Sequence, residues 1–280
     1  TYTVSGSNAT ITGCATSATG AVVVPETIDG YKVTTIGNYA FSGCSEITSI
    51  DLGKVTTLGY SIFTGCTSLK SITFPITYTT TTRGYYSNEW GPLTGSSITD
   101  VVFEEGTNYI PDYACYQGTS VKNITLPEYE DYDINGYVIG GLAFAYTAIQ
   151  TIKLPDTLTK IETGVFSGCH SLTSITVPDN VTSVGASAFT DCTNLVKAHV
   201  GKSVTSLGSG VFSQCSSLTD VVIGNAVTSI GEYGFSACSK LVNIKMGDKV
   251  QTLGNYMFQN CYNLESVDLN NVATLGFAIF

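Results

Sequence analysis

Residues 166–189 read FSGCHSLTSITVPDNVTSVGASAF, and the pattern that begins at Phe166 starts again at Phe189. From Phe166 to Phe258 the interval between successive copies stays at 23 residues. The phenylalanine position, held by Leu or Cys in two degenerate copies, occurs eleven times: Phe41, Phe63, Leu93, Cys115, Phe144, Phe166, Phe189, Phe212, Phe235, Phe258 and Phe280. A fixed period of this length is typical of solenoids, in which each repeat packs against its neighbours. The sequence therefore predicts a stack of about eleven coils.

Each repeat contains two segments with different hydrophobic patterns. In the first, alternation predicts a short strand that turns Ile175 and Val177 inward and leaves Ser174 and Thr176 on the outer face. The second segment, residues 181–189, returns across the coil and directs its own apolar residues into the core. Stacking joins these side chains into internal columns, at about 2 kcal/mol for each large buried side chain.

A glycine recurs at the same place in most of the returning segments. We expect this position to be tight, or to have a positive φ, because glycine lacks a Cβ atom. Its occupants are Gly37, Gly59, Gly185, Gly208, Gly231, Gly254 and Gly276.

The repeats resemble the BspA-like subfamily of leucine-rich repeats. Its Leu-x-x-Ile-x-x-Pro strand matches residues 172–178, and its Ile-Gly-x-x-Ala-Phe-x-x-Cys segment matches residues 36–44. The resemblance implies a mostly β solenoid, with capping strands in residues 1–35 and parallel-stranded coils of 22–23 residues over 36–280. Because Phe280 falls in mid-repeat, the array is expected to be truncated there. The resemblance also implies a surface or secreted protein that acts in adhesion or recognition and carries no catalytic motif.

Composition limits the classes of partner. The net charge of −10 would repel phosphate backbones, so nucleic acid is a poor candidate. No apolar run approaches the roughly 18 residues needed to span a bilayer, so we expect no membrane insertion in this segment. The sequence supports an extracellular protein whose partner is a protein or glycoprotein, with a glycan as a further option.

Two repeats carry inserts of about seven residues, at 76–92 and 128–142, which we expect to emerge on one side, about 10 Å apart. Aromatic side chains on loops of a rigid scaffold are common in recognition sites. The alternative is that these rings pack down and cover irregular coils. The candidate ligand-binding residues are Tyr85, Tyr86, Trp90, Tyr129, Tyr132 and Tyr137.

The second insert also contains a possible calcium motif. Asp131, Asp133, Asn135 and Gly136 have the spacing that opens an EF-hand loop, in which alternate oxygen ligands precede a sharp turn. The closing Glu is missing, because Leu142 stands in its place. The alternative is a solvated acidic turn without a metal.

Two further sets of side chains bear on function. Lys197 and His199 lie on the predicted outer sheet and are candidate ligand contacts; the alternative is an ordinary solvated sheet. With two isolated histidines, His170 and His199, no catalytic constellation can be assembled and we expect no enzyme. Seven cysteines share one repeat position, and we expect a ladder of buried thiols there: Cys44, Cys66, Cys169, Cys192, Cys215, Cys238 and Cys261.

The resulting hypothesis is a non-catalytic recognition or adhesion protein that binds host or matrix proteins or glycoproteins. Two alternatives remain open from the residues alone. One is a structural spacer that displays another domain. The other is a carbohydrate-binding module that stacks sugars on Trp90 and nearby tyrosines.

Overall fold

The computed structural model describes residues 1–80, 90–128, 136–269 and 271–280. They fall into two compact units, unit 1 (Thr1–Pro127) and unit 2 (Glu128–Phe280). Each unit is a parallel β-solenoid, as the repeat predicted, and no helix occurs in the described ranges. Across those ranges, accordingly, there is no helix with the length and apolar character needed to cross a membrane.

Unit 1 begins with an antiparallel hairpin, β1 (Tyr2–Ser5) and β2 (Asn8–Ile11). Strand β2 then pairs in parallel with β5 (Tyr31–Ile36), and the same sheet continues through β7 (Thr57–Leu58) to β9 (Thr79–Thr80). The remaining strands of this unit are β3 (Gly20–Val23), β4 (Thr27–Ile28), β6 (Ile47–Asp51), β8 (Ser71–Phe74), β10 (Asp100–Phe103), β11 (Tyr109–Ile110) and β12 (Asn123–Thr125). Of these, β8, β10 and β12 form a parallel sheet of their own.

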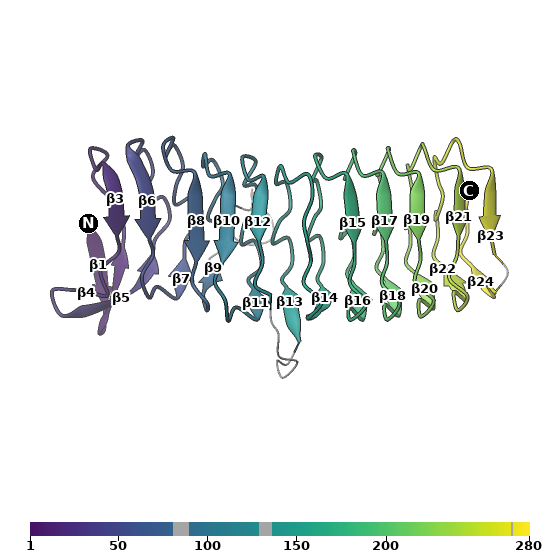
Figure 1. Ribbon diagram of the computed structural model, residues 1–280, viewed down its shortest axis with the longest axis horizontal. Coiled ribbons are helices and arrows are strands. Elements are labelled where there is room, and N and C mark those ends of the chain that lie inside the picture. Colours follow the sequence, from purple (N-terminus) through teal and green to yellow (C-terminus); the bar gives the residue numbers. More distant parts are fainter. Residues whose placement is uncertain (81–89, 129–135, 270) are drawn as a thin grey trace. The chain divides into compact units, whose positions relative to one another are not determined.

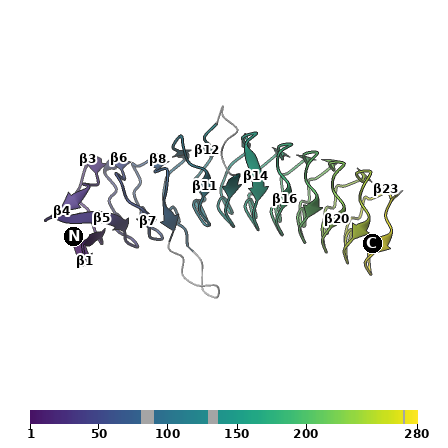
Figure 2. The same cartoon turned by 90° about the horizontal axis from the view of Figure 1, so that it is seen from below.

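From β15 (Ser174–Thr176) onward unit 2 repeats one coil with little variation, and each of these coils gives one strand to each of two parallel sheets (Figures 1 and 2). The first sheet contains β15 (Ser174–Thr176), β17 (Lys197–His199), β19 (Asp220–Val222), β21 (Asn243–Lys245) and β23 (Ser266–Asp268). The second contains β13 (Tyr137–Ile139), β14 (Leu158–Ile161), β16 (Ser183–Val184), β18 (Ser206–Leu207), β20 (Ser229–Ile230), β22 (Thr252–Leu253) and β24 (Thr274–Leu275).

The core of unit 2 is a column of stacked phenylalanines. Phe189 and Phe212 are fully buried, with ring centroids 5.2 Å apart and planes 9° from parallel. Phe235 continues the column 5.5 Å beyond Phe212. The predicted inward residues Ile175 and Val177 are buried as well, while Ser174 and Thr176 are exposed. The hydrophobic pattern therefore predicted the core correctly.

The recurring glycine is tight, but it does not have the positive φ that the sequence allowed. A Cβ atom on Gly208 would lie 2.3 Å from the backbone nitrogen of Ala186 in the preceding coil. The equivalent distance at Gly254, to the nitrogen of Glu232, is 2.4 Å. Glycine is required here because two coil backbones approach each other more closely than a methyl group permits.

In unit 2, positive φ occurs instead two residues before and two residues after each repeat phenylalanine from Phe144 to Phe258. Around Phe189 these residues are Ser187 (φ 54°) and Asp191 (φ 60°). The amides of Ser187, Phe189 and Asp191 all donate to carbonyls of the next coil, at 2.8, 2.9 and 2.8 Å. Alternating left-handed residues turn every second amide in the same direction along the stack. These three hydrogen bonds offset the strain of about 1 kcal/mol that each left-handed side-chain-bearing residue costs.

Candidate functional site

Seven of the eleven predicted site residues lie in segments outside the described residues. Those that lie outside the described residues are Tyr85, Tyr86, Tyr129, Tyr132, Asp131, Asp133 and Asn135. Within the described ranges, no group of three or more His, Cys, Asp or Glu side chains is arranged to hold a metal ion. The calcium motif therefore stays a prediction.

Tyr137 is not on the surface, so the expectation that it is an exposed contact is wrong. Its side chain is 1% exposed, because Tyr137 opens β13 and pairs with Leu158, a core residue of β14. Tyr78 of the first insert is similarly buried, at 6% exposure, and its ring stacks 4.9 Å from that of Phe74. For these two tyrosines the alternative interpretation, packing onto the coil, is the one observed.

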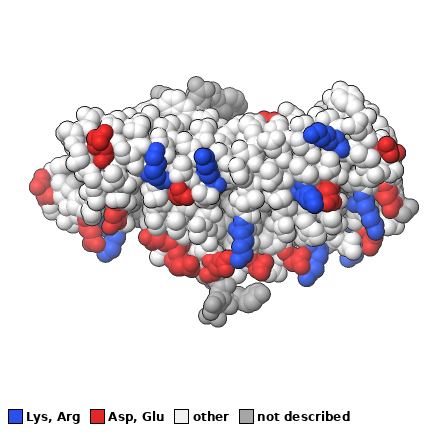
Figure 3. Space-filling model, turned by 45° about the horizontal axis from the view of Figure 1, so that its top comes forward, with Lys and Arg blue, Asp and Glu red and all other residues white. Residues whose placement is uncertain are grey.

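Lys197 and His199 do lie on the outer face of β17, where both side chains are exposed. Their partners in register on β19 are Asp220 and Val222, and Val222 is 45% exposed. This face alternates small, charged and apolar side chains. In Figure 3, likewise, acidic and basic side chains lie interspersed on a mainly uncharged surface. Nothing about Lys197 or His199 distinguishes them as an anchor for a ligand.

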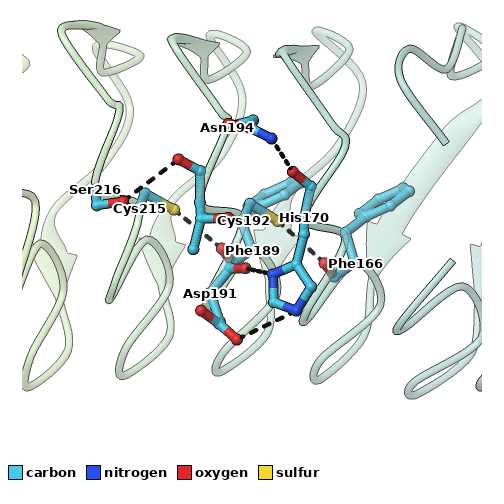
Figure 4. Close-up of polar contacts among 9 residues, drawn as sticks. Phe166, His170, Phe189, Asp191, Cys192, Asn194, Cys215 and Ser216 are labelled. Carbon is cyan, nitrogen blue, oxygen red and sulfur yellow. Dashed lines mark hydrogen bonds and ion pairs between the residues drawn. The ribbon is translucent and has the colours of Figure 1, made fainter. Parts of the chain in front are cut away.

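His170 contacts Asp191 of the next coil through both of its ring nitrogens. Its Nδ1 lies 2.9 Å from the carbonyl oxygen of Asp191 and its Nε2 lies 3.7 Å from the carboxylate of the same residue (Figure 4). The amide side chain of Asn194 donates to the His170 carbonyl at 2.7 Å. Because the nearby Cys192 thiol is buried and bonds to the carbonyl of Phe166, this group does not form a nucleophile–base pair.

The cysteine ladder is a set of free thiols, and each also serves as a hydrogen-bond donor. The Sγ atoms of Cys192 and Cys215 donate to the carbonyls of Phe166 and Phe189, one coil back, both at 3.1 Å (Figure 4). All nine cysteines are unpaired, and seven are buried. The prediction of buried thiols is confirmed for six of the seven ladder positions, while Cys261 is only partly buried. The hydrogen bonds explain why cysteine, and not alanine, recurs at this position.

These thiols are expected to resist alkylation in the folded protein. Desolvation raises the pKa of the Cys215 thiol to about 12, and the thiolate is the reactive form. Iodoacetamide at pH 8 should therefore modify the partly exposed Cys14 first and Cys215 only after unfolding. Peptide mass mapping with and without guanidinium measures this order. Rapid modification of Cys215 in the native protein would contradict the ladder.

An aromatic cluster on unit 1 is the most distinctive surface feature of the described residues. The ring of Trp90 lies 6.0 Å from that of Tyr39 and 5.9 Å from that of Tyr60. Tyr39 and Tyr60 are 5.3 Å apart, and all three contacts are edge-to-face. Tyr39 is 40% exposed, while Tyr60 and Trp90 are partly exposed. We call these three residues the aromatic cluster.

The backbone of successive coils holds the cluster in place. The amide of Tyr39 donates to the carbonyl of Tyr60 at 3.1 Å, and the side chain of Asn38 accepts from the Tyr60 amide at the same distance. Behind Trp90, Gly91 lies so close to the next coil that a Cβ atom would be 2.6 Å from the carbonyl oxygen of Tyr113. The rings therefore project from backbone that is hydrogen-bonded to, or packed closely against, the neighbouring coils.

Three consecutive coils thus contribute one ring each. Tyr60 and Trp90 both stand three residues before the phenylalanine position of their coils. Asn38 and Asp112 hold this position in the coils on either side, and both are exposed. The surface consists of aromatic rings flanked at each end by a side chain that forms hydrogen bonds.

Sequence reasoning identified Trp90 but missed Tyr39 and Tyr60. The available signal was their place just before the phenylalanine position, Tyr39 two residues ahead of Phe41 and Tyr60 three residues ahead of Phe63, in the returning segment. Unit 2 contains a second group that was missed, in which Tyr256 stacks on Tyr233 at 4.8 Å and contacts Phe277 edge-on at 4.8 Å. In that group the rings of Tyr233 and Tyr256 largely cover each other.

The stacked coils, the cysteine and glycine ladders and the strand motif together define a leucine-rich repeat protein. The sequence profile of the BspA type leucine rich repeat region matches residues 25–138, 137–265 and 211–280. The chain belongs to the BspA-type leucine-rich repeat family.

Solved bacterial structures share this fold. A leucine-rich repeat protein from Bacteroides ovatus is 23% identical, with a TM-score of 0.50 over 99% of this chain and 88% of that one. A leucine rich cell surface protein from Faecalibacterium prausnitzii is 18% identical, with a TM-score of 0.50 over 98% and 92%. A leucine-rich repeat protein from Eubacterium ventriosum is 20% identical, with a TM-score of 0.54 over 88% and 67%. The comparison with curated proteins gives no match.

Proposed function

We propose that this chain is a non-catalytic recognition protein, at the cell surface or secreted, that binds host or matrix proteins or glycoproteins. The family and a neighbour described as a cell surface protein support a repeat protein for protein interaction in such a location. The aromatic cluster carries the proposal, because it presents two tyrosines and the single tryptophan on a rigid support.

Physical reasons favour this cluster over the outer strand face. Tyrosine and tryptophan dominate binding hot spots, since each buries a large area and loses little side-chain entropy. A support that is already ordered removes a further cost of binding. The strand face around Lys197 and His199 offers exposed polar side chains, which contribute less to binding when they stay solvated.

The test compares the two surfaces on one set of probes. Binding of the full chain to immobilised extracellular-matrix glycoproteins should weaken at least about tenfold in Trp90→Ala, the effect of losing a hot-spot aromatic. The matched controls Lys197→Ala and His199→Ala should change the Kd less than about threefold. The proposal fails if the controls abolish binding while Trp90→Ala does not. If no probe binds the wild-type chain, the result favours the alternative that the chain is a structural spacer displaying another domain.

A further inference from the structure

Resting on the proposed function, we infer that the aromatic cluster binds the neutral sugar residues of a glycoprotein glycan. Asn38 and Asp112 flank the rings and would hold the sugar hydroxyl groups. The proposed function does not specify which part of a glycoprotein contacts the aromatic cluster, and the inference assigns that part to the glycan. It rests on three features of unit 1: the ring geometry, the flanking side chains and the local charge.

The ring geometry suits the apolar face of a sugar. Tyr39 is 40% exposed and Tyr60 and Trp90 are partly exposed, so the cluster presents aromatic surface to solvent. The C–H groups on one side of a pyranose carry a small positive charge, which the negative face of an aromatic ring attracts. The three ring centroids lie 5.3 to 6.0 Å from one another, so the rings form a compact triangle. More than one ring of this triangle can therefore contact the same sugar residue.

The flanking side chains suit sugar hydroxyl groups. Asn38 and Asp112 occupy the same repeat position as Tyr60 and Trp90 and are exposed. The Asp112 carboxylate accepts a hydrogen bond from the Tyr109 hydroxyl at 3.1 Å, and the Asp112 carbonyl accepts one from Thr80 at 2.6 Å. These contacts fix the position of Asp112. A carboxylate and an amide together accept from and donate to the hydroxyl groups that line the edge of a sugar ring.

Charge favours a neutral sugar over an acidic one. The row that runs from Asn38 through Tyr60 and Trp90 to Asp112 contains one carboxylate and no lysine or arginine. An anionic sugar placed along it would be repelled by the Asp112 carboxylate. The net charge of −10 acts in the same direction.

The experiment separates the glycan from the protein that carries it. The full chain and its variants are tested on an array of neutral and sialylated oligosaccharides, and on matrix glycoproteins before and after enzymatic removal of their glycans. We expect binding to neutral oligosaccharides that weakens roughly tenfold in Trp90→Ala and Tyr60→Ala. Trp90→Tyr should retain most of the affinity because a ring face remains. Asp112→Ala should weaken binding, whereas Tyr256→Ala, in the stacked aromatic group of unit 2, should leave it unchanged.

Three outcomes would overturn the inference, and they differ in what they say of the proposed function. Binding that survives removal of the glycans but is lost in Trp90→Ala excludes the sugar and retains protein recognition at the same surface. Binding that is unchanged in Trp90→Ala excludes the aromatic cluster as the binding site, for glycan and for protein alike. Absence of binding to every neutral oligosaccharide would also reject the inference. Circular dichroism and thermal melting of each variant verify that unit 1 remains folded.

Discussion

Replacing Gly208 with alanine is expected to destabilise unit 2 by about 3 kcal/mol, at the upper end of the usual effect of overpacking. The added Cβ atom would lie 2.3 Å from the Ala186 nitrogen and 2.5 Å from the Gly185 carbonyl carbon. Both are backbone atoms of the preceding coil, so no side-chain rotation can relieve the overlap. The coils must separate, which weakens the hydrogen bond of 2.9 Å from the Gly208 amide to the carbonyl of Val184.

Gly210 provides the matched control two residues away. It has φ +64°, and a Cβ atom there would approach the Ser187 Oγ at 3.4 Å. Gly210→Ala therefore introduces only left-handed backbone strain, about 1 kcal/mol. The free energies of unfolding in urea should rank wild type, Gly210→Ala and Gly208→Ala in order of falling stability. A larger loss in Gly210→Ala would mean that the close approach of the coils is not the reason for glycine at 208.

These two glycines show how far the sequence can be interpreted. Periodicity alone identified Gly208 and its counterparts as special, and it predicted the buried faces of the strands correctly. It could not distinguish a tight contact from a positive φ, because glycine satisfies both. Ser187 and Asp191 have positive φ but are not glycines, so the sequence does not mark them as left-handed. The hydrogen bonds that stabilise this conformation are made with the following coil.

The candidate site was harder to predict for a related reason. Trp90 attracted attention as the single tryptophan, but its neighbours Tyr39 and Tyr60 are 51 and 30 residues away along the chain. Only the stacking of the coils brings the three rings together. Tyr39 and Tyr60 are surface residues that were missed, whereas Tyr137 was assigned to the surface insert although it fills a core position in β13. The boundary between an insert and the strand that follows it depends on register, which composition does not specify.

Phe212→Ala is expected to produce the largest loss of stability, about 3–5 kcal/mol. Phe212 is fully buried, and its ring stacks on Phe189 at 5.2 Å and on Phe235 at 5.5 Å. Truncation to alanine loses the free energy of burying one large side chain. It also leaves Phe189 and Phe235 with one stacking partner fewer each. Because each coil contacts only its neighbours, the resulting cavity lies in the middle of the column, where the fixed coil spacing limits collapse.

The measurement is the free energy of unfolding from urea titration, monitored by circular dichroism. Val222→Ala is the control from the same coil, since Val222 is 45% exposed and its truncation should cost about 0.5 kcal/mol or less. Phe212→Leu should fall between the two, because leucine fills most of the cavity but cannot stack. If Phe212→Ala cost less than about 1 kcal/mol, the stacked phenylalanines would not be the main source of stability in unit 2. The hydrogen bonds between successive coils would then have to supply it.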